Sequence, residues 1–392
     1  MAKKPAIQSI RIQNLFSFGE ESERIDLRPL NVLIGPNGSG KSNFVETIGL
    51  LKAIPKDFAD AVVRSGGISD CLWRGTDETP VAQIEVVVNP RRTKSPIRYS
   101  LEFTKKARKL AIVDETVTTE GPAGPRGNVP TFLRYENGAP VLYSNGSKQS
   151  FPDDEQDPQQ SVLSQRQDPT RYPEVTYLGR LLGSFRLYLD WEFGHASSVR
   201  ELYRPEAKND YLEEDISNLG IMLNRFDSDP HVGPELRRNL TAFYEDAVDI
   251  HTPIDSGKLD IHLEEKNQVS MLATRLSDGT LRWLFLLTIL LHPAPPPLVC
   301  IEEPELGLHP DIMRPLADLM IEASERMQLI VTTHSDTLVD HLTEIPDSVV
   351  VCEKEEGATR LKRLDKQRLS SWLKRYRLGE LWRTGEIGGT RW

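Results

Sequence analysis

Apolar and polar residues alternate along the N-terminal part of the chain in the pattern of β-strands. β-prone runs cover Ile7–Ile12 and Arg24–Leu27, and the continuous apolar run Asn31–Ile34 predicts a buried strand. The runs Val81–Val88 and Arg98–Phe103 alternate with the two-residue period of half-buried strands. This part of the chain is therefore expected to be rich in sheet.

Helical spacing of apolar residues begins at Val175 and continues to Val248, where Leu178, Leu181 and Leu182 fit one helical face. Two later apolar runs, ending at Ile301 and at Val331, have the length of strands buried on both faces. Strands that alternate with helices predict an α/β fold with a mixed sheet and flanking helices. No fixed-period repeat or sustained heptad pattern indicates a long coiled coil.

Turn-forming residues separate these regions. Gly121–Gly127 is a glycine- and proline-rich connector, Asn137-Gly138 and Asn145-Gly146 are hairpin signals, and Phe151–Pro173 is polar and proline-rich. We expect a small sheet followed by a mobile loop. The predicted division of the chain is residues 1–120, an N-terminal lobe; 121–265, a small sheet, loop and helical insertion; 266–355, a C-terminal lobe; and 356–392, a basic tail.

Composition excludes several classes of protein. Three widely spaced cysteines offer neither a disulfide framework nor a zinc cluster, and the chain begins with no signal-like apolar run, so we expect a cytoplasmic protein that does not enter a membrane. The net charge is −10, but residues 360–392 hold ten Lys/Arg and three Asp/Glu, a net charge of +7. The remainder therefore carries −17, and any contact with a polyanion would be local to the tail.

The loop that follows the Asn31–Ile34 strand has the spacing G-x-x-x-x-G-K-[ST], which cradles phosphates between a strand and a helix. Its glycines allow backbone N–H groups to converge on a phosphate, Lys41 adds a positive charge, and the Ser42 hydroxyl is a ligand for Mg²⁺. We therefore predict that ATP and Mg²⁺ bind here. The expected binding residues are Gly35, Pro36, Asn37, Gly38, Ser39, Gly40, Lys41, Ser42 and Asn43.

Two later strands end in residues suited to phosphate chemistry. The strand ending at Ile301 delivers Glu302 and Glu303, and the strand ending at Thr332 is followed by His334. At the carboxyl ends of strands, where ligands bind in open α/β sheets, Glu302 would hold Mg²⁺ through water and Glu303 would orient the attacking water. A neutral His334 would hydrogen-bond a phosphate or that water. The predicted catalytic residues are Glu303, His334 and Lys41.

The sequence Leu276–Thr280 precedes an apolar helix over Leu281–Leu291. Ser277 is a natural N-cap, and Gly279 leaves the helix N-terminus accessible to an anion. Taken alone, this segment is better explained as an ordinary capped helix than as a functional site.

Together these motifs resemble the ABC-type ATPase heads of the SMC, RecF and OLD group, and most of all compact bacterial AAA family ATPases (AAA_21-like) that lack a coiled coil and a Toprim domain. The resemblance covers residues 7–90 and 266–353. By this resemblance Gly35–Ser42 is Walker A, Ser277–Thr280 the signature and Glu302-Glu303 Walker B with its catalytic glutamate. Glu305–His309 is the D-loop and His334 the switch histidine.

The resemblance implies an ABC-type P-loop NTPase head with a helical insertion, acting as a Mg²⁺-dependent ATPase. In such heads the signature of one subunit caps the γ-phosphate bound to the other, so Ser277 and Gly279 would act in trans within a homodimer or a larger oligomer. The chain departs from the group in three places. Walker B ends Glu-Glu in place of Asp-Glu, Phe16 stands where many relatives have arginine, and the Q-loop has only two weak candidates, Gln160 and Gln165.

Only 58 residues follow His334, too few for the nuclease domain of OLD relatives. Within them, Asp365–Arg377 has the spacing of a basic amphipathic helix, which either packs on the head or contacts DNA or a partner. Two biological outputs remain open. The acidic bulk favours a switch or scaffold in anti-phage defence with a separately encoded, nuclease-like effector. The alternative is a RecF-like, DNA-stimulated ATPase in DNA repair or chromosome maintenance.

Overall fold

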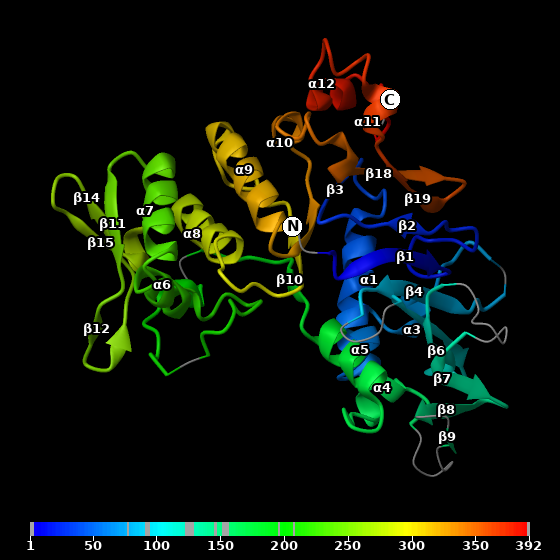
Figure 1. Cartoon of the computed structure of the whole chain (residues 1–392). Coiled ribbons are helices and arrows are strands. Elements are labelled where there is room, and N and C mark those ends of the chain that lie inside the picture. The colour runs from blue at the N-terminus through cyan, green and yellow to red at the C-terminus, as the bar shows by residue number, and fades with distance from the viewer. Residues whose placement is uncertain are drawn as a thin grey trace.

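The computed structural model describes residues 4–76, 78–90, 95–121, 129–144, 147–150, 157–194, 197–206 and 208–389. The hairpin signal Asn145-Gly146 and parts of the expected mobile loop lie outside these residues. Two large sheets form the body of the molecule, and a group of helices with a small sheet extends to one side (Figure 1).

The first large sheet is antiparallel and comes mainly from the N-terminal third. Its strand order is β2 (Ile25–Asp26), β1 (Ile7–Gln13), β4 (Ala82–Val88), β5 (Ile97–Lys106), β6 (Lys109–Thr119), β7 (Thr131–Glu136), β8 (Ala139–Ser144) and β9 (Ser147–Ser150). The strands predicted from alternation over 81–88 and 98–103 are confirmed as β4 and β5. Strands β7 to β9 do not form the separate small sheet expected, because β7 pairs with β6 and extends this one.

The second large sheet carries the predicted phosphate loop. Its order is β10 (Arg186–Tyr188), β16 (Leu298–Glu302), β17 (Gln328–Thr332), β3 (Leu30–Ile34), β18 (Val349–Glu355) and β19 (Ala358–Arg363). All neighbours are parallel except the β18–β19 hairpin. The carboxyl ends of β16, β17 and β3 therefore meet at one edge of the sheet. Residues 358–363, which the sequence assigned to the tail, are an edge strand.

The apolar strands of this second sheet are buried on both faces. Val32 and Ile34 face one hydrophobic core, whereas Leu33 between them faces the other. The second core contains Phe44 and Ile48 of α1 (Lys41–Ala53), which thus lies between the two sheets. This helix ends just before Pro55, as predicted. Four more helices follow on this side: α2 (Phe58–Arg64), α3 (Ile68–Cys71), α4 (Val162–Gln165) and α5 (Pro173–Gly183).

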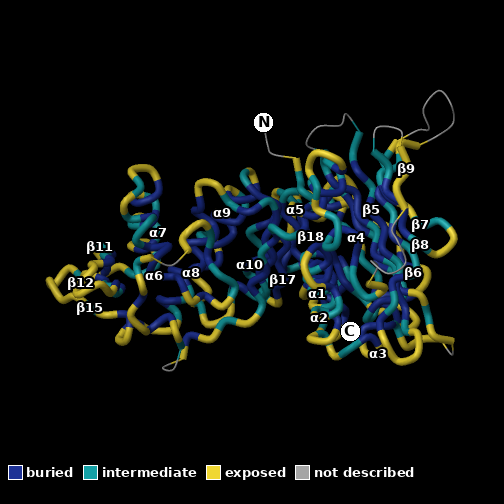
Figure 2. Tube along the Cα trace, turned by 90° about the horizontal axis from the view of Figure 1, so that it is seen from below, coloured by how far each residue is buried: buried dark blue, intermediate teal, exposed yellow. Residues whose placement is uncertain are grey.

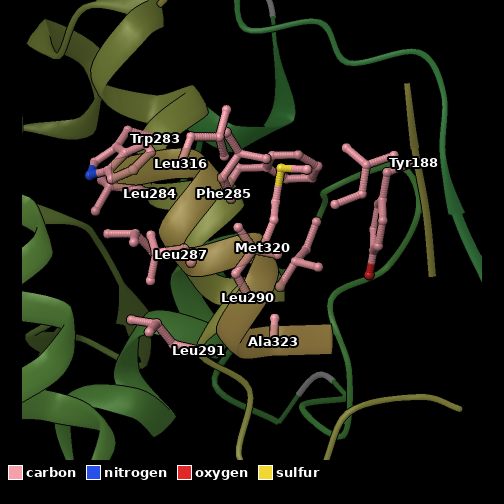
Figure 3. Packing of buried hydrophobic residues seen from close by; sticks show 14 of the residues in the cluster. Tyr188, Trp283, Leu284, Phe285, Leu287, Leu290, Leu291, Leu316, Met320 and Ala323 are labelled. Atoms are coloured by element: carbon pink, nitrogen blue, oxygen red, sulfur yellow. The ribbon is translucent and has the colours of Figure 1, made fainter. Parts of the chain in front are cut away.

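The other core is formed by helices that cover the opposite face of the sheet. Helix α8 (Asp278–Leu290) is apolar nearly all round because it packs on α6 (Leu219–Asp227), α7 (Val232–Phe243) and α9 (Met313–Ser324). Phe285 of α8 lies beside Leu316 and Met320 of α9 in this core (Figure 3). Between Val175 and Val248 the chain is less helical than expected, since β10 and an irregular stretch separate α5 from α6.

A small sheet of β11 (Ala247–His251), β14 (His262–Glu265) and β15 (Ser270–Leu272) lies beyond α7. The hairpin β12 (Ile254–Asp255) and β13 (Lys258–Leu259) projects from it. This outermost part is largely exposed, in contrast to the buried strands of the large sheets (Figure 2).

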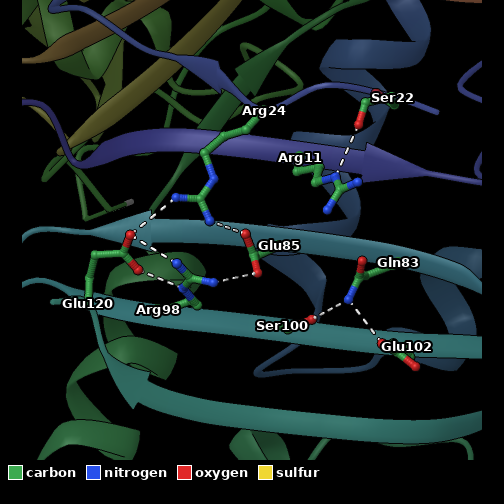
Figure 4. A network of polar contacts seen from close by, with 9 residues as sticks. All are labelled: Arg11, Ser22, Arg24, Gln83, Glu85, Arg98, Ser100, Glu102 and Glu120. Atoms are coloured by element: carbon green, nitrogen blue, oxygen red, sulfur yellow. Dashed lines mark hydrogen bonds and ion pairs between the residues drawn. The ribbon is translucent and has the colours of Figure 1, made fainter. Parts of the chain in front are cut away.

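Polar contacts fix the position of the first sheet. Arg24 and Arg98 each pair with both Glu85 and Glu120 across neighbouring strands (Figure 4). Gln328, at the start of β17, accepts a hydrogen bond from the Ile7 N–H and donates one to the Ile7 carbonyl, both at 2.9 Å. This buried amide therefore joins the two large sheets.

The C-terminal segment differs from its predicted helix. Residues 365–377 form only the short α11 (Lys366–Leu369) followed by turns. Leu369 and Leu373 pack on the core, whereas Trp372 and Tyr376 remain exposed. The next helix, α12 (Leu378–Arg383), docks on α10 (Asp336–Asp340). Within the described residues, none of the helices has the length and apolar character needed to cross a bilayer.

Candidate nucleotide-binding site

The phosphate loop joins β3 to α1 and has the backbone that its glycines predict. Gly35, Gly38 and Gly40 all have positive φ, and Gly40 is the N-cap of α1. A Cβ on Gly35 would lie 2.2 Å from the Cys352 carbonyl oxygen, and one on Gly40 would lie 2.1 Å from the Thr359 hydroxyl. Only glycine fits these two positions.

The Lys41 side chain folds back onto the phosphate loop. Its ammonium donates to the carbonyls of Gly35 at 2.9 Å and Pro36 at 3.2 Å. Burial lowers the pKa of Lys41, and the nearby carboxylates Glu303 and Glu302 oppose that shift. Within the loop, Asn37 and Gly38 are exposed, whereas Ser39 is buried with a hydroxyl that has no hydrogen-bond partner.

Two oxygen-bearing side chains meet at the start of α1. Burial raises the pKa of Glu302, and a hydrogen bond with Ser42 opposes the rise. Hydroxyl and carboxylate oxygens are the ligands that Mg²⁺ prefers, so this pair fits a hydrated Mg²⁺ ion. Both line a cleft of about 760 Å³ together with Asp190, whose charge also raises the pKa of Glu302.

Glu303 and His334 face each other across the ends of β16 and β17. The His334 Nε2 lies 3.5 Å from a Glu303 carboxylate oxygen, and both side chains are about one-third exposed. Burial, and then the charge of Lys41, lowers the pKa of His334, so its imidazole is neutral at pH 7. Glu303 has a φ of +44°, a strained conformation that is uncommon outside glycine. The Glu303 carboxylate lies close enough to Lys41 for its charge to raise the pKa of that ammonium.

Other predicted residues lie apart from this centre. The Asn43 amide donates to the Ser17 hydroxyl at 2.7 Å, so it braces the loop. Gln160 hydrogen-bonds Phe58 and Asp57 beyond the C-terminal end of α1, and Gln165 bonds the Gln160 carbonyl. Because α1 has 13 residues at ~1.5 Å each, neither glutamine candidate is placed near the phosphate loop.

The predicted signature turn stands at the N-terminus of α8. The Ser277 hydroxyl accepts a 3.0 Å hydrogen bond from the Thr280 N–H, which confirms the expected N-cap. Gly279 lies against the predicted D-loop, where a Cβ would be 3.2 Å from the Gly307 carbonyl oxygen. Helix α8 packs on α6, α7 and α9, whereas α1 packs on α2 and α5.

Sequence reasoning missed two groups that support the site. Thr359 on β19 donates to the Ser39 carbonyl at 2.9 Å and contacts the Ser17 hydroxyl at 2.7 Å, although it is 320 residues from the loop. Asp190 follows the short strand β10 and enters the cleft beside Glu302. No motif marked either residue, because both depend on which strands become neighbours in the sheet.

The chain resembles known proteins both in its sequence and in its fold. Residues 30–340 match the AAA_21 family, described as "AAA domain, putative AbiEii toxin, Type IV TA system". The chain belongs to this family. No curated protein matches its sequence.

Solved structures give the fold of this AAA_21 chain. It is similar to an SMC head bound to the C-terminal winged-helix domain of ScpA, with a TM-score of 0.54 and 16% identity over 93% of this chain and 99% of that one. It is also similar to an SMC head with an extended coiled coil from Pyrococcus furiosus, with a TM-score of 0.51 and 15% identity over 94% and 99%. Its fold is therefore that of the SMC head, an α/β P-loop NTPase fold, as the motifs predicted.

Proposed function

We propose that this AAA_21 protein is a Mg²⁺-dependent ATPase that closes as a homodimer around ATP and opens on hydrolysis. One observation carries the proposal: the ends of three adjacent parallel strands bring Lys41, Glu303 and His334 to a single edge. A phosphate-binding loop, a carboxylate suited to orient water and a neutral imidazole are the groups that phosphoryl transfer to water requires.

Each side chain has a role that its surroundings support. Lys41 would leave its two loop carbonyls to contact the β- and γ-phosphates. Ser42 and Glu302 would hold Mg²⁺, which when bound neutralises charge on the phosphate oxygens. Glu303 would orient the attacking water, and the neutral His334 beside it would donate its ring N–H to the γ-phosphate.

The position of the predicted signature, at the exposed N-terminus of α8, supports a dimer. Ser277 is exposed, and Gly279 packs on the D-loop of its own chain, so a second copy is the natural source of the triphosphate that this helix start would cap. The D-loop side chain Leu306 is 51% exposed, as a contact residue of such an interface would be. Each of the two pockets would then contain Walker A of one subunit and the signature of the other.

Trapping the closed state tests this proposal. Glu303→Gln should keep ATP bound and give a dimer in light scattering with ATP and Mg²⁺. Adding Ser277→Arg should return it to the monomer mass, since a bulky charge would block the signature, while ATP binding persists. An unchanged monomer mass of the Glu303→Gln protein under these conditions would contradict the proposal.

For biological output, we favour a cytoplasmic switch or scaffold in anti-phage defence that acts with a separately encoded effector. The matched family's description refers to a toxin of a toxin–antitoxin system, and the chain outside residues 360–392 carries a net charge of −17. Pull-down from the native host, followed by ATPase assays with the recovered protein, tests this role. Recovery of a nuclease-like neighbour that alters ATP turnover would support it.

A DNA-stimulated ATPase is the alternative, and the segment 366–377 favours it. This segment holds five Lys/Arg and no Asp/Glu, and its exposed Trp372 and Tyr376 rings lie 6.0 Å apart. Salt-sensitive stimulation of ATP hydrolysis by duplex DNA would support this alternative. Replacing Lys374 and Arg375 with glutamate should then abolish the stimulation and leave the basal rate unchanged.

A further inference from the structure

Arg200 is a buried arginine that none of the sequence motifs includes. It ends the 3₁₀ turn η2 (Ser198–Arg200), in the stretch that connects β10 to α6, and its side chain is only 6% exposed. Its guanidinium faces the 3₁₀ turn η3 (Ala273–Arg275), which leads directly into the signature.

The guanidinium spans the whole approach to the signature helix. One of its terminal nitrogens donates to the carbonyl oxygens of Ala273 at 2.9 Å and Leu276 at 2.8 Å. The other pairs with the carboxylate of Asp278, the first residue of α8. The Nε donates to the Phe193 carbonyl at 3.0 Å and so fixes the arginine itself.

This arrangement requires arginine. A guanidinium directs its N–H groups in a planar fork, so it can bond to carbonyls at both ends of η3 and to Asp278 at once. A lysine ammonium is a single point on a flexible stem and cannot reproduce these separated contacts. Loss of the fork would leave two carbonyls and one carboxylate without this partner.

We propose that Arg200 is a positioning residue that holds the signature turn, and with it Ser277 and Gly279, in the orientation needed to meet ATP on a second copy of the chain. Its effect on turnover rests on the proposed ATP-dependent dimer. Its effect on the turn does not, because the contacts exist within one chain.

The same connection reaches the nucleotide site of its own subunit. Leu189 and Asp190 line the cleft that contains Ser42 and Glu302. Trp191 and Phe193 then pack against Phe285 of α8, at ring-centroid distances of 4.4 and 5.9 Å, the first pair tilted and the second edge-to-face. Arg200 is thus the far end of a packed connection between the predicted Mg²⁺ ligands and the signature of one subunit.

Hydrogen exchange without nucleotide tests the local claim. Arg200→Lys should speed exchange of the Thr280 and Leu281 amides, which bond to Ser277, by roughly tenfold to hundredfold, the effect of losing charge-assisted hydrogen bonds. Arg237→Lys is the matched control, since Arg237 of α7 is also ion-paired, with Asp227 at the end of α6 and Asp249 of β11, away from η3. Equal exchange at these amides in wild type and Arg200→Lys, or the same increase in Arg237→Lys, would overturn the proposal.

Dimerisation tests the consequence for function. In a Glu303→Gln background, Arg200→Lys should weaken the ATP-dependent dimer by roughly tenfold to hundredfold while ATP binding to the monomer stays unchanged. A dimer of unchanged affinity would overturn the positioning role. If the Glu303→Gln protein itself stays monomeric, the proposed dimer fails, and the exchange experiment still decides whether Arg200 holds the turn.

Discussion

The Glu305 carboxylate accepts a 2.7 Å hydrogen bond from the backbone N–H of His334. The same oxygen accepts a second 2.7 Å bond from the Thr333 hydroxyl, and the other oxygen is buried with no partner. The turn that begins at Glu305, the predicted D-loop, is therefore bonded directly to the strand end that carries His334. If the proposed dimer forms through this turn, its movement would reach His334 through a single side chain.

This contact predicts a difference between two substitutions at Glu305. Glu305→Gln keeps one oxygen that can accept both bonds, so its ATP turnover should stay within a few-fold of wild type. Glu305→Ala removes the acceptor and lets His334 move, which should lower turnover by roughly 10²-fold, as for other misplaced catalytic groups. Steady-state ATPase assays measure both, and equally active variants would show that Glu305 does not position His334.

The environment of His334 predicts the direction of its titration. Burial and Lys41 both disfavour the imidazolium, whereas Glu303 favours it, so the pKa lies below the ordinary 6.5. In Glu303→Gln the opposing carboxylate is lost, and the pKa should fall further. NMR titration of the imidazole in the nucleotide-free protein measures both values, and a rise in Glu303→Gln would contradict the contact.

Thr359, on the distant strand β19, is predicted to support the phosphate loop through its hydroxyl. Thr359→Val keeps the shape but removes the hydroxyl that bonds the Ser39 carbonyl. A lost hydrogen bond of ~1 kcal/mol should weaken ATP binding by about fivefold. Thr359→Ser keeps the hydroxyl and should bind like wild type in calorimetry. Equal affinities for the valine and serine variants would exclude this role.

Two glycines predict opposite changes in stability. A Cβ on Gly379 of α12 would lie 2.1 Å from the Asp336 carbonyl oxygen, so Gly379→Ala should force α12 from α10 and lower the free energy of unfolding by about 1–3 kcal/mol. A Cβ on Gly49, within α1, would meet only Leu187 at 3.4 Å. Gly49→Ala should raise the free energy of unfolding by about 0.5–1 kcal/mol. Denaturant unfolding distinguishes the two, and equal effects would show that the α10–α12 contact does not restrict Gly379.

Local sequence was sufficient where a short segment determines its own structure. The glycines of the phosphate loop, the start of α1 and the Ser277 cap depend on residues a few positions apart, so their geometry could be predicted. The continuous apolar runs around Val32 and Val331 likewise predicted strands buried on both faces, because such strands have no polar side. The family and fold could be inferred from these motifs together.

The tertiary structure alone decided which distant residues meet. The order β16–β17–β3 places His334 beside Glu303, and the β18–β19 hairpin brings Thr359 onto the phosphate loop. Arg200 reaches the signature only because the connection after β10 packs on α8. The predicted helix over 365–377 formed only as the short α11 (Lys366–Leu369) followed by turns, and the helical spacing of its apolar residues did not reveal where it would end. Sequence periodicity records which side of an element is buried, whereas strand order and long-range packing depend on the free energy of the whole chain.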